Sequence, residues 1–167
     1  MYVETLRLTP TWVWLLLFFL IYRGVNALRP RQTSLWRTLL VPVIFLIWGV
    51  ASLQASVQQQ LPAYLAFLTF LVLGTLVGWR LWPRHLIATY DAETRQIARC
   101  GSPIPLILIG FAFLSKYILA ATLANEPVLA STHAFAVLSG SINGLADGLF
   151  WGITLHQLWP LRRQILL

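Results

Sequence analysis

Five stretches of the sequence are each long and apolar enough to form a helix across a bilayer. A helix needs about 20 residues, each adding about 1.5 Å, to cross roughly 30 Å of hydrocarbon. Of the 167 residues, 58% are hydrophobic and 10% are charged, and one soluble core of this size could not bury so much apolar surface. The sequence therefore predicts a single all-α integral membrane domain over residues 1–167. Its transmembrane helices are expected at 8–28, 36–57, 61–82, 104–124 and 133–158.

The first apolar stretch is expected to remain in the mature protein. Glu4 precedes it, and no small-residue cleavage site follows Ile21 and Tyr22. A cleavable signal peptide has a basic segment before the apolar run and small residues after it. We therefore count this stretch as the first helix.

The basic residues predict how the chain is oriented, because lysine and arginine are enriched in cytoplasmic loops. The side opposite the main basic cluster receives Arg7, a glutamine-rich turn near 56–62 and the 125–132 turn with Glu126. We therefore expect the N-terminus outside and the C-terminus inside. The net charge of +7 is explained by this orientation, so a nucleic-acid partner is not expected. The arginines expected on the inner side are Arg23, Arg29, Arg31, Arg37, Arg80, Arg84, Arg95, Arg99, Arg162 and Arg163.

The segment between the third and fourth helices is the only sizeable soluble piece. Its pattern is typical of a β-hairpin over 86–99, with strands at 86–90 and 95–99 and a turn at 91–94. A lone hairpin is marginally stable in water, so it would have to rest on headgroups, a helix end or a partner. The alternative, a continued helix, stays open. We expect the hairpin on the cytoplasmic side.

Small residues recur every four positions in the last helix and form a row along one face. Such a row lets another helix backbone approach closely. Two interpretations stay open: the row is an interface for a second copy or another membrane protein, or it packs against a helix of the same chain. The third helix carries a shorter version that could supply the facing surface. The row comprises Ala136, Gly140, Gly144, Gly148 and Gly152, and the shorter version comprises Gly74 and Gly78.

Ser139, Asn143 and Asp147 form a polar stripe beside the glycine row, and Lys116 lies within the preceding helix. An ionisable group at the centre of hydrocarbon costs about 2.5–3.5 kcal/mol on insertion scales, so these groups are expected to find partners. Counted from the outer turn by the helical rise, Lys116 lies about 13 Å deep, Asn143 about 15 Å and Asp147 about 21 Å. Lys116 should therefore meet Asn143 more readily than Asp147, while a direct ion pair stays open. Tyr117 projects about 100° away from Lys116 and is expected to pack against a neighbouring helix.

Three roles fit this buried polar spot: a structural latch between the last two helices, a proton-responsive site in a small carrier, or an anchor for a headgroup or another subunit. No catalytic residue, metal site or cofactor is expected, because no hydrolase, phosphate-loop or metalloprotease motif occurs. His85, His133 and His156 lack a recognised ligand spacing, and the single Cys100 excludes an internal disulfide.

Four motifs stand out along the chain: Thr9-Pro10-Thr11-Trp12-Val13-Trp14, Leu28-Arg29-Pro30-Arg31, Tyr90-Asp91 with Thr94, and Gly101-Ser102-Pro103-Ile104-Pro105-Leu106 leading to Phe113 and Lys116-Tyr117. With these motifs the chain resembles a family of small uncharacterised proteobacterial inner-membrane proteins. A basic loop followed by a proline-bearing span is also similar to the CcdC-like membrane proteins linked to cytochrome c maturation. The first resemblance implies a helical bundle in a bacterial inner membrane, marks Gly101, Ser102, Lys116 and Tyr117 as signature positions, and brings no established activity.

These features together predict a non-enzymatic, multi-pass inner-membrane protein. We expect it to bind or assemble with another membrane component through the glycine-lined face and the buried polar spot. Membrane lipid, a second copy of the chain or another membrane protein are the expected partners. The alternative is a small carrier or proton-coupled transporter that uses Lys116 and Asp147.

Overall fold

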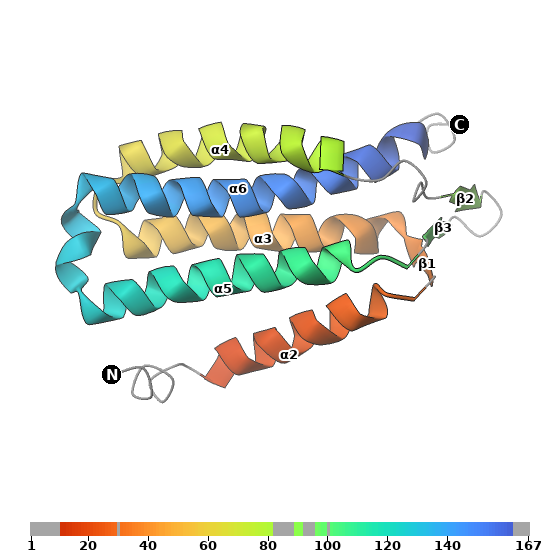
Figure 1. Cartoon of the computed structure of the whole chain (residues 1–167), viewed down its shortest axis with the longest axis horizontal. Helices are drawn as coiled ribbons and strands as arrows, with labels where there is room; N and C mark the ends of the chain where they lie inside the picture. Colours follow the sequence, from red (N-terminus) through yellow and green to blue (C-terminus); the bar gives the residue numbers. More distant parts are fainter. Residues whose placement is uncertain (1–10, 30, 82–88, 92–95, 100, 162–167) are drawn as a thin grey trace.

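The computed structural model describes residues 11–29, 31–81, 89–91, 96–99 and 101–161. Within them, five α-helices run roughly along the long axis of the molecule (Figure 1). The predicted number of helices is confirmed, and the last four begin and end within one residue of the predicted bounds. Residues 8–10 of the first predicted helix lie outside the described residues. The helices are α2 (Thr11–Asn26), α3 (Leu35–Ser56), α4 (Gln60–Leu81), α5 (Ile104–Asn125) and α6 (His133–Leu158), with short 3₁₀ helices η2 (Pro127–Ser131) and η3 (Trp159–Leu161).

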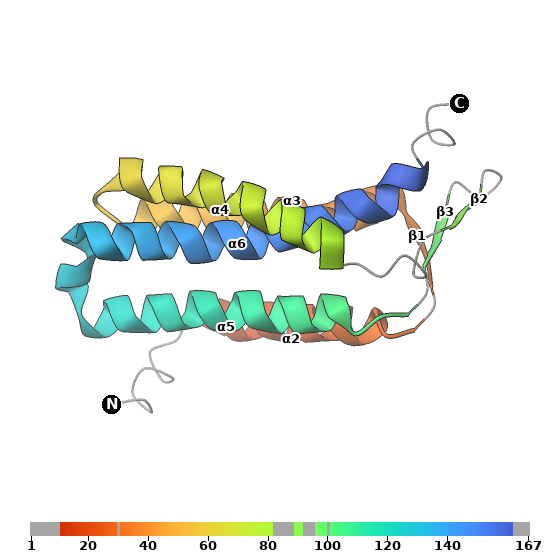
Figure 2. The same cartoon turned by 45° about the horizontal axis from the view of Figure 1, so that its top comes forward.

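Helix α6 is the central element of the bundle (Figures 1 and 2). It packs along its length against α4 and also contacts α3 and α5, whereas α2 lies against α5. Two clusters of buried side chains join these helices. One centres on Phe45, Ile109 and Phe150, and the other on Leu53 and Phe67. The core is therefore built around α6.

By length and composition, three helices are able to cross a membrane: Trp36–Ser56, Gln60–Leu81 and Ile104–Asn125. Helix α6 is long enough but less apolar, because it carries the glycine row and the polar stripe. Helices α3, α4 and α5 pack against it, and a helix partly covered by protein does not need an apolar surface all round. Within α2 the described apolar segment, Leu17–Asn26, is shorter.

Two turns are bonded to each other at the end of the bundle that carries η2. The backbone amide of Gln58 donates to the carbonyl oxygen of Ala130 over 2.9 Å, and Gln59 Nε2 donates to the carbonyl oxygen of Ser131 over 2.8 Å. The ring nitrogen Nδ1 of His133 lies 3.2 Å from Gln59 Oε1. These bonds hold the α3–α4 turn against the start of α6.

At the opposite end, three strands form a small antiparallel sheet in the order β1-β3-β2. They are β1 (Arg31–Ser34), β2 (Thr89–Asp91) and β3 (Gln96–Arg99). Strands β2 and β3 fall in the segment interpreted as a hairpin, whose residues 86–88 and 92–95 lie outside the described residues. Strand β1 was not predicted from the sequence, and it pairs with β3 in the register Arg31 to Arg99. The cytoplasmic location of this segment stays a prediction.

The signature residues Gly101 and Ser102 connect α2 to the start of α5. The backbone amide of Ser102 donates to the carbonyl oxygen of Ala27 over 2.9 Å. A Cβ atom at Gly101 would lie 2.6 Å from the carbonyl carbon of Leu28, closer than real Cβ atoms come. Glycine is therefore required for this close approach, which fixes α2 beside α5.

Candidate functional site

The glycine row of α6 faces the backbone of α4 in the same chain. A Cβ atom at Gly144 would lie 3.0 Å from the Cα atom of Phe67, and one at Gly148 would lie 3.0 Å from the Cα atom of Gly74. Gly140 and Gly152 likewise meet the backbone of α4, and Ala136 is fully buried beside them. The row is thus covered by α4.

The shorter row on α4 completes this seam from the other side. A Cβ atom at Gly74 would lie 2.7 Å from the carbonyl oxygen of Leu145, and one at Gly78 would lie 2.6 Å from that of Leu149. Of the two interpretations left open by the sequence, contact within one chain is the one that this geometry supports. The face is occupied, so a docking surface has to be sought elsewhere on the bundle.

The structure brings Lys116 of α5 and Asn143 of α6 together in the middle of the bundle. Lys116 Nζ donates a hydrogen bond to Asn143 Oδ1, and Asn143 Nδ2 donates to the carbonyl oxygen of Ser139 over 2.8 Å. The Lys116 ammonium also lies over the indole ring of Trp48, 4.9 Å from its centroid. Lys116 is 7% exposed and Asn143 is 1% exposed, so this cation is held by an amide and an aromatic face away from solvent.

Asp147 is fully buried, one turn further along α6. Both carboxylate oxygens lack a hydrogen-bond partner among the described residues. The carboxylate points at Gly49 of α3, where an added Cβ atom would collide with Asp147 Oδ2. The nearby Lys116 ammonium attracts it electrostatically. Buried polar atoms without partners are rare, which makes Asp147 the most unusual group in this core.

Trp48 and Gly49 belong to this site, although the sequence analysis did not select them. The available signal was modest: Gly49 is the single glycine of its apolar stretch and follows a tryptophan.

Two further residues selected from the sequence, Tyr117 and Ser139, lie near this site. Tyr117 stacks on Phe113, with ring centroids 6.4 Å apart and planes at 11°. The Ser139 hydroxyl is buried and has no hydrogen-bond partner in the described part of the chain. The polar cluster therefore joins α3, α5 and α6.

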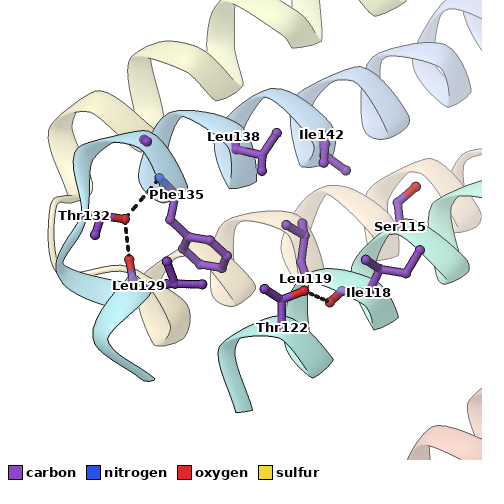
Figure 3. Close-up of a pocket in the computed structure, with 10 residues that line it drawn as sticks. Ser115, Ile118, Leu119, Thr122, Leu129, Thr132, Phe135, Leu138 and Ile142 are labelled. Atoms are coloured by element: carbon purple, nitrogen blue, oxygen red, sulfur yellow. Dashed lines mark hydrogen bonds between the residues drawn. The ribbon is translucent and has the colours of Figure 1, made fainter. Parts of the chain in front are cut away.

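An apolar groove of about 410 Å³ lies between α5 and α6, next to this cluster and towards the η2 end (Figure 3). Both threonine hydroxyls of the groove donate hydrogen bonds to backbone carbonyl oxygens of the same chain. Thr122 Oγ1 donates to Ile118 over 2.9 Å, and Thr132 Oγ1 donates to Leu129 over 2.8 Å. The groove was not predicted from the sequence, because it depends on how α5 and α6 pack against each other. Its lining is Ser115, Ile118, Leu119, Thr122, Leu129, Thr132, Ala134, Phe135, Leu138 and Ile142.

Within the described residues, no three His, Cys, Asp or Glu side chains gather as metal ligands would. His156 packs edge-on against Trp79, with ring centroids 5.1 Å apart. The site thus consists of the polar cluster and the groove beside it.

The sequence matches a family of unknown function, DUF6622, over residues 1–162. The chain belongs to this family. No curated protein and no solved structure matches it. The family match agrees with the resemblance to an uncharacterised family and supplies no activity, so a function has to be argued from the site.

Proposed function

We propose that this DUF6622 protein crosses the inner membrane of a proteobacterium five times, with its N-terminus outside and the sheet on the cytoplasmic side. Three of its helices have the length and composition for crossing, and their outward side chains are large and apolar. Helix α6 would cross inside the ring formed by its neighbours, and α2 would cross beside α5. The arginines near the sheet support this orientation, because positive charge is retained in the cytoplasm.

Within that membrane, the protein binds or assembles with another membrane component and does not catalyse a reaction. The observation that carries this proposal is the apolar groove between α5 and α6, which opens on the side of the bundle (Figure 3). Exposed Ile118 and Leu138 stand at the groove and continue into the apolar outer surface of α5. Concave apolar surfaces of this kind mark sites of interaction.

The polar cluster supports a binding role over an enzymatic one. Lys116 is bonded to Asn143 and lies over the ring of Trp48. None of the polar residues Lys116, Ser139, Asn143 and Asp147 lines the groove. A reacting substrate would need polar groups that converge on an open space. We therefore assign Lys116, Asn143 and Ser139 to a latch that sets the position of α5 against α6, and hence the shape of the groove.

Site-specific photocrosslinking in native membranes tests this assignment. Benzoylphenylalanine at Ile118, which is 54% exposed at the groove, should give discrete adducts with one membrane component. The matched control is Ile107, on the same helix and 65% exposed but outside the groove. Equal adduct patterns at the two positions would contradict binding at the groove.

A second candidate is a small proton-coupled carrier, favoured by the buried Asp147 carboxylate without a hydrogen-bond partner. Intramembrane carboxylates of this kind commonly mark ion or proton pathways. Liposomes containing the protein would then move protons or a solute, and both Lys116→Met and Asp147→Asn would stop the flux. Flux that persists in both variants would exclude these residues from transport.

A further inference from the structure

We propose that the groove between α5 and α6 holds one acyl chain of an outer-leaflet phospholipid. This inference rests on the proposed membrane location and names the membrane component bound at the groove. It is carried by the depth of the groove, the chemistry of its lining and the shape of its walls (Figure 3).

The depth matches one leaflet. On α5 the lining residues run from Thr122 inward to Ser115, seven residues or about 10.5 Å, and Ser115 lies ten residues or about 15 Å from the helix end at Asn125. On α6 the lining runs from Ala134 to Ile142, eight residues or about 12 Å. Half of a hydrocarbon core of roughly 30 Å is about 15 Å. A chain that enters at the η2 end would therefore reach Ser115 at the bilayer midplane.

The lining fits hydrocarbon and offers no site for a headgroup. Both threonine hydroxyls are bonded to carbonyl oxygens of their own turns, so Ser115 carries the remaining hydroxyl of an otherwise apolar lining. Lys116 follows Ser115 in sequence but does not line the groove, since it is bonded to Asn143. At about 410 Å³, the groove has the volume of roughly 14 water molecules at ~30 Å³ each. A methylene group is of similar size, so a single chain of comparable carbon number fits.

The walls also discriminate between a lipid and a transmembrane helix. Where two helices of this protein approach closely, at the α4–α6 seam, glycines remove the side chains. The groove instead presents branched and aromatic side chains, including Leu119, Phe135 and Ile142. A rigid partner helix needs small residues for close packing, whereas a flexible chain follows an irregular wall. The lining therefore favours an acyl chain.

The test uses the full-length protein in nanodiscs of phosphatidylcholine that contain a phosphatidylcholine with a diazirine in one acyl chain. After illumination, peptide mapping locates the carbene adducts. Two phenylalanines of α6 form a matched pair: Phe135 at the groove is 6% exposed, and Phe150 in the core is 7% exposed. We expect Phe135 to be labelled several-fold more than Phe150, because only Phe135 would contact a chain.

Position along the chain and a filling substitution make the test specific. A diazirine near the carboxyl end should label Leu129, and one near the methyl end should label Ile142. Ile118→Trp fills the groove and should remove most Phe135 adducts, whereas Ile107→Trp on the outer surface of the same helix should not.

The outcomes separate this inference from the proposed function. Labelling of Ile107 with equal labelling of Phe135 and Phe150 would overturn the acyl-chain site while leaving the membrane location intact. Absence of adducts at Ile107 as well would overturn both. A protein adduct at Ile118 in native membranes that displaces the lipid would assign the groove to a partner helix, and so would also overturn the acyl-chain site.

Discussion

A methyl group added at Gly144 is expected to destabilise the protein, whereas the same methyl group added at Gly110 is expected to stabilise it. Both glycines lie inside helices, so each replacement by alanine favours helix formation by up to about 1 kcal/mol. Their surroundings differ. No atom lies within 4 Å of a Cβ atom built at Gly110, while one built at Gly144 would meet the backbone of Phe67.

The magnitude follows from the distance that α4 must move. A Cβ atom at Gly144 would collide with the carbonyl oxygen of Phe67 and lie 3.0 Å from its Cα and carbonyl carbon, whereas ordinary contacts begin at 3.4 Å. Backbone cannot rotate away as a side chain can, so the two helices must separate. A gap of about 0.5–1 Å forfeits a quarter to a half of each dispersion contact along the seam. Overpacking of this kind typically costs about 1–3 kcal/mol, which exceeds the gain in helix propensity.

Equilibrium unfolding in mixed micelles, followed by circular dichroism, measures both free-energy changes. We expect Gly144→Ala to lower the free energy of unfolding by a net value of roughly 1–2 kcal/mol and Gly110→Ala to raise it by up to about 1 kcal/mol. Changes of the same sign and size at both positions would refute the argument, because the α4–α6 seam would then not be closely packed.

Three further predictions concern the polar cluster. Gly49→Ala is expected to lower the free energy of unfolding by about 1–3 kcal/mol, because the added methyl group overpacks against Asp147. In the Asp147→Ala background the same substitution should cost much less. Additive effects of the two substitutions in a double-mutant cycle would contradict a contact between residues 49 and 147. Lys116→Met is expected to lower the free energy of unfolding by about 1–3 kcal/mol, because it leaves the Asn143 oxygen buried without a donor. Adding Asn143→Leu to the same chain should restore part of this loss. Thermal unfolding in detergent measures both changes. Trp48→Leu removes the aromatic face under the Lys116 ammonium and should lower the free energy of unfolding by about 1–2 kcal/mol, whereas Trp48→Phe should lower it less. An equal decrease in the two variants would exclude a role for the aromatic ring.

The sequence was sufficient to predict the helices but not strand β1. Apolar stretches of about 20 residues delimit helices directly, because length and hydropathy are local properties of the chain. Strand β1 has only four residues, Arg31–Ser34, without an alternating pattern, and it forms because β3 lies alongside it. Such a strand is specified by its partner and not by its own residues.

The polar cluster was predictable in part. Helical rise placed Lys116 and Asn143 at similar depth, and the structure joins them by a hydrogen bond. The same arithmetic could not indicate that Asp147 turns towards Gly49 of α3, because depth along an axis carries no information on which helix lies on which side. The groove was missed for the same reason.

The sequence by itself determined the number and length of the helices, and it placed small residues along one face of α6 with polar residues beside them. Only the tertiary structure decided that α4 covers the glycine row, that α3 and α5 enclose the polar stripe, and that α5 and α6 leave a groove between them. The physical reason is that hydrocarbon is as apolar as the outer surface of these helices, so burial of apolar area does not dictate their order around α6. That order is set by close packing and by polar contacts, which exist only once the helices have come together.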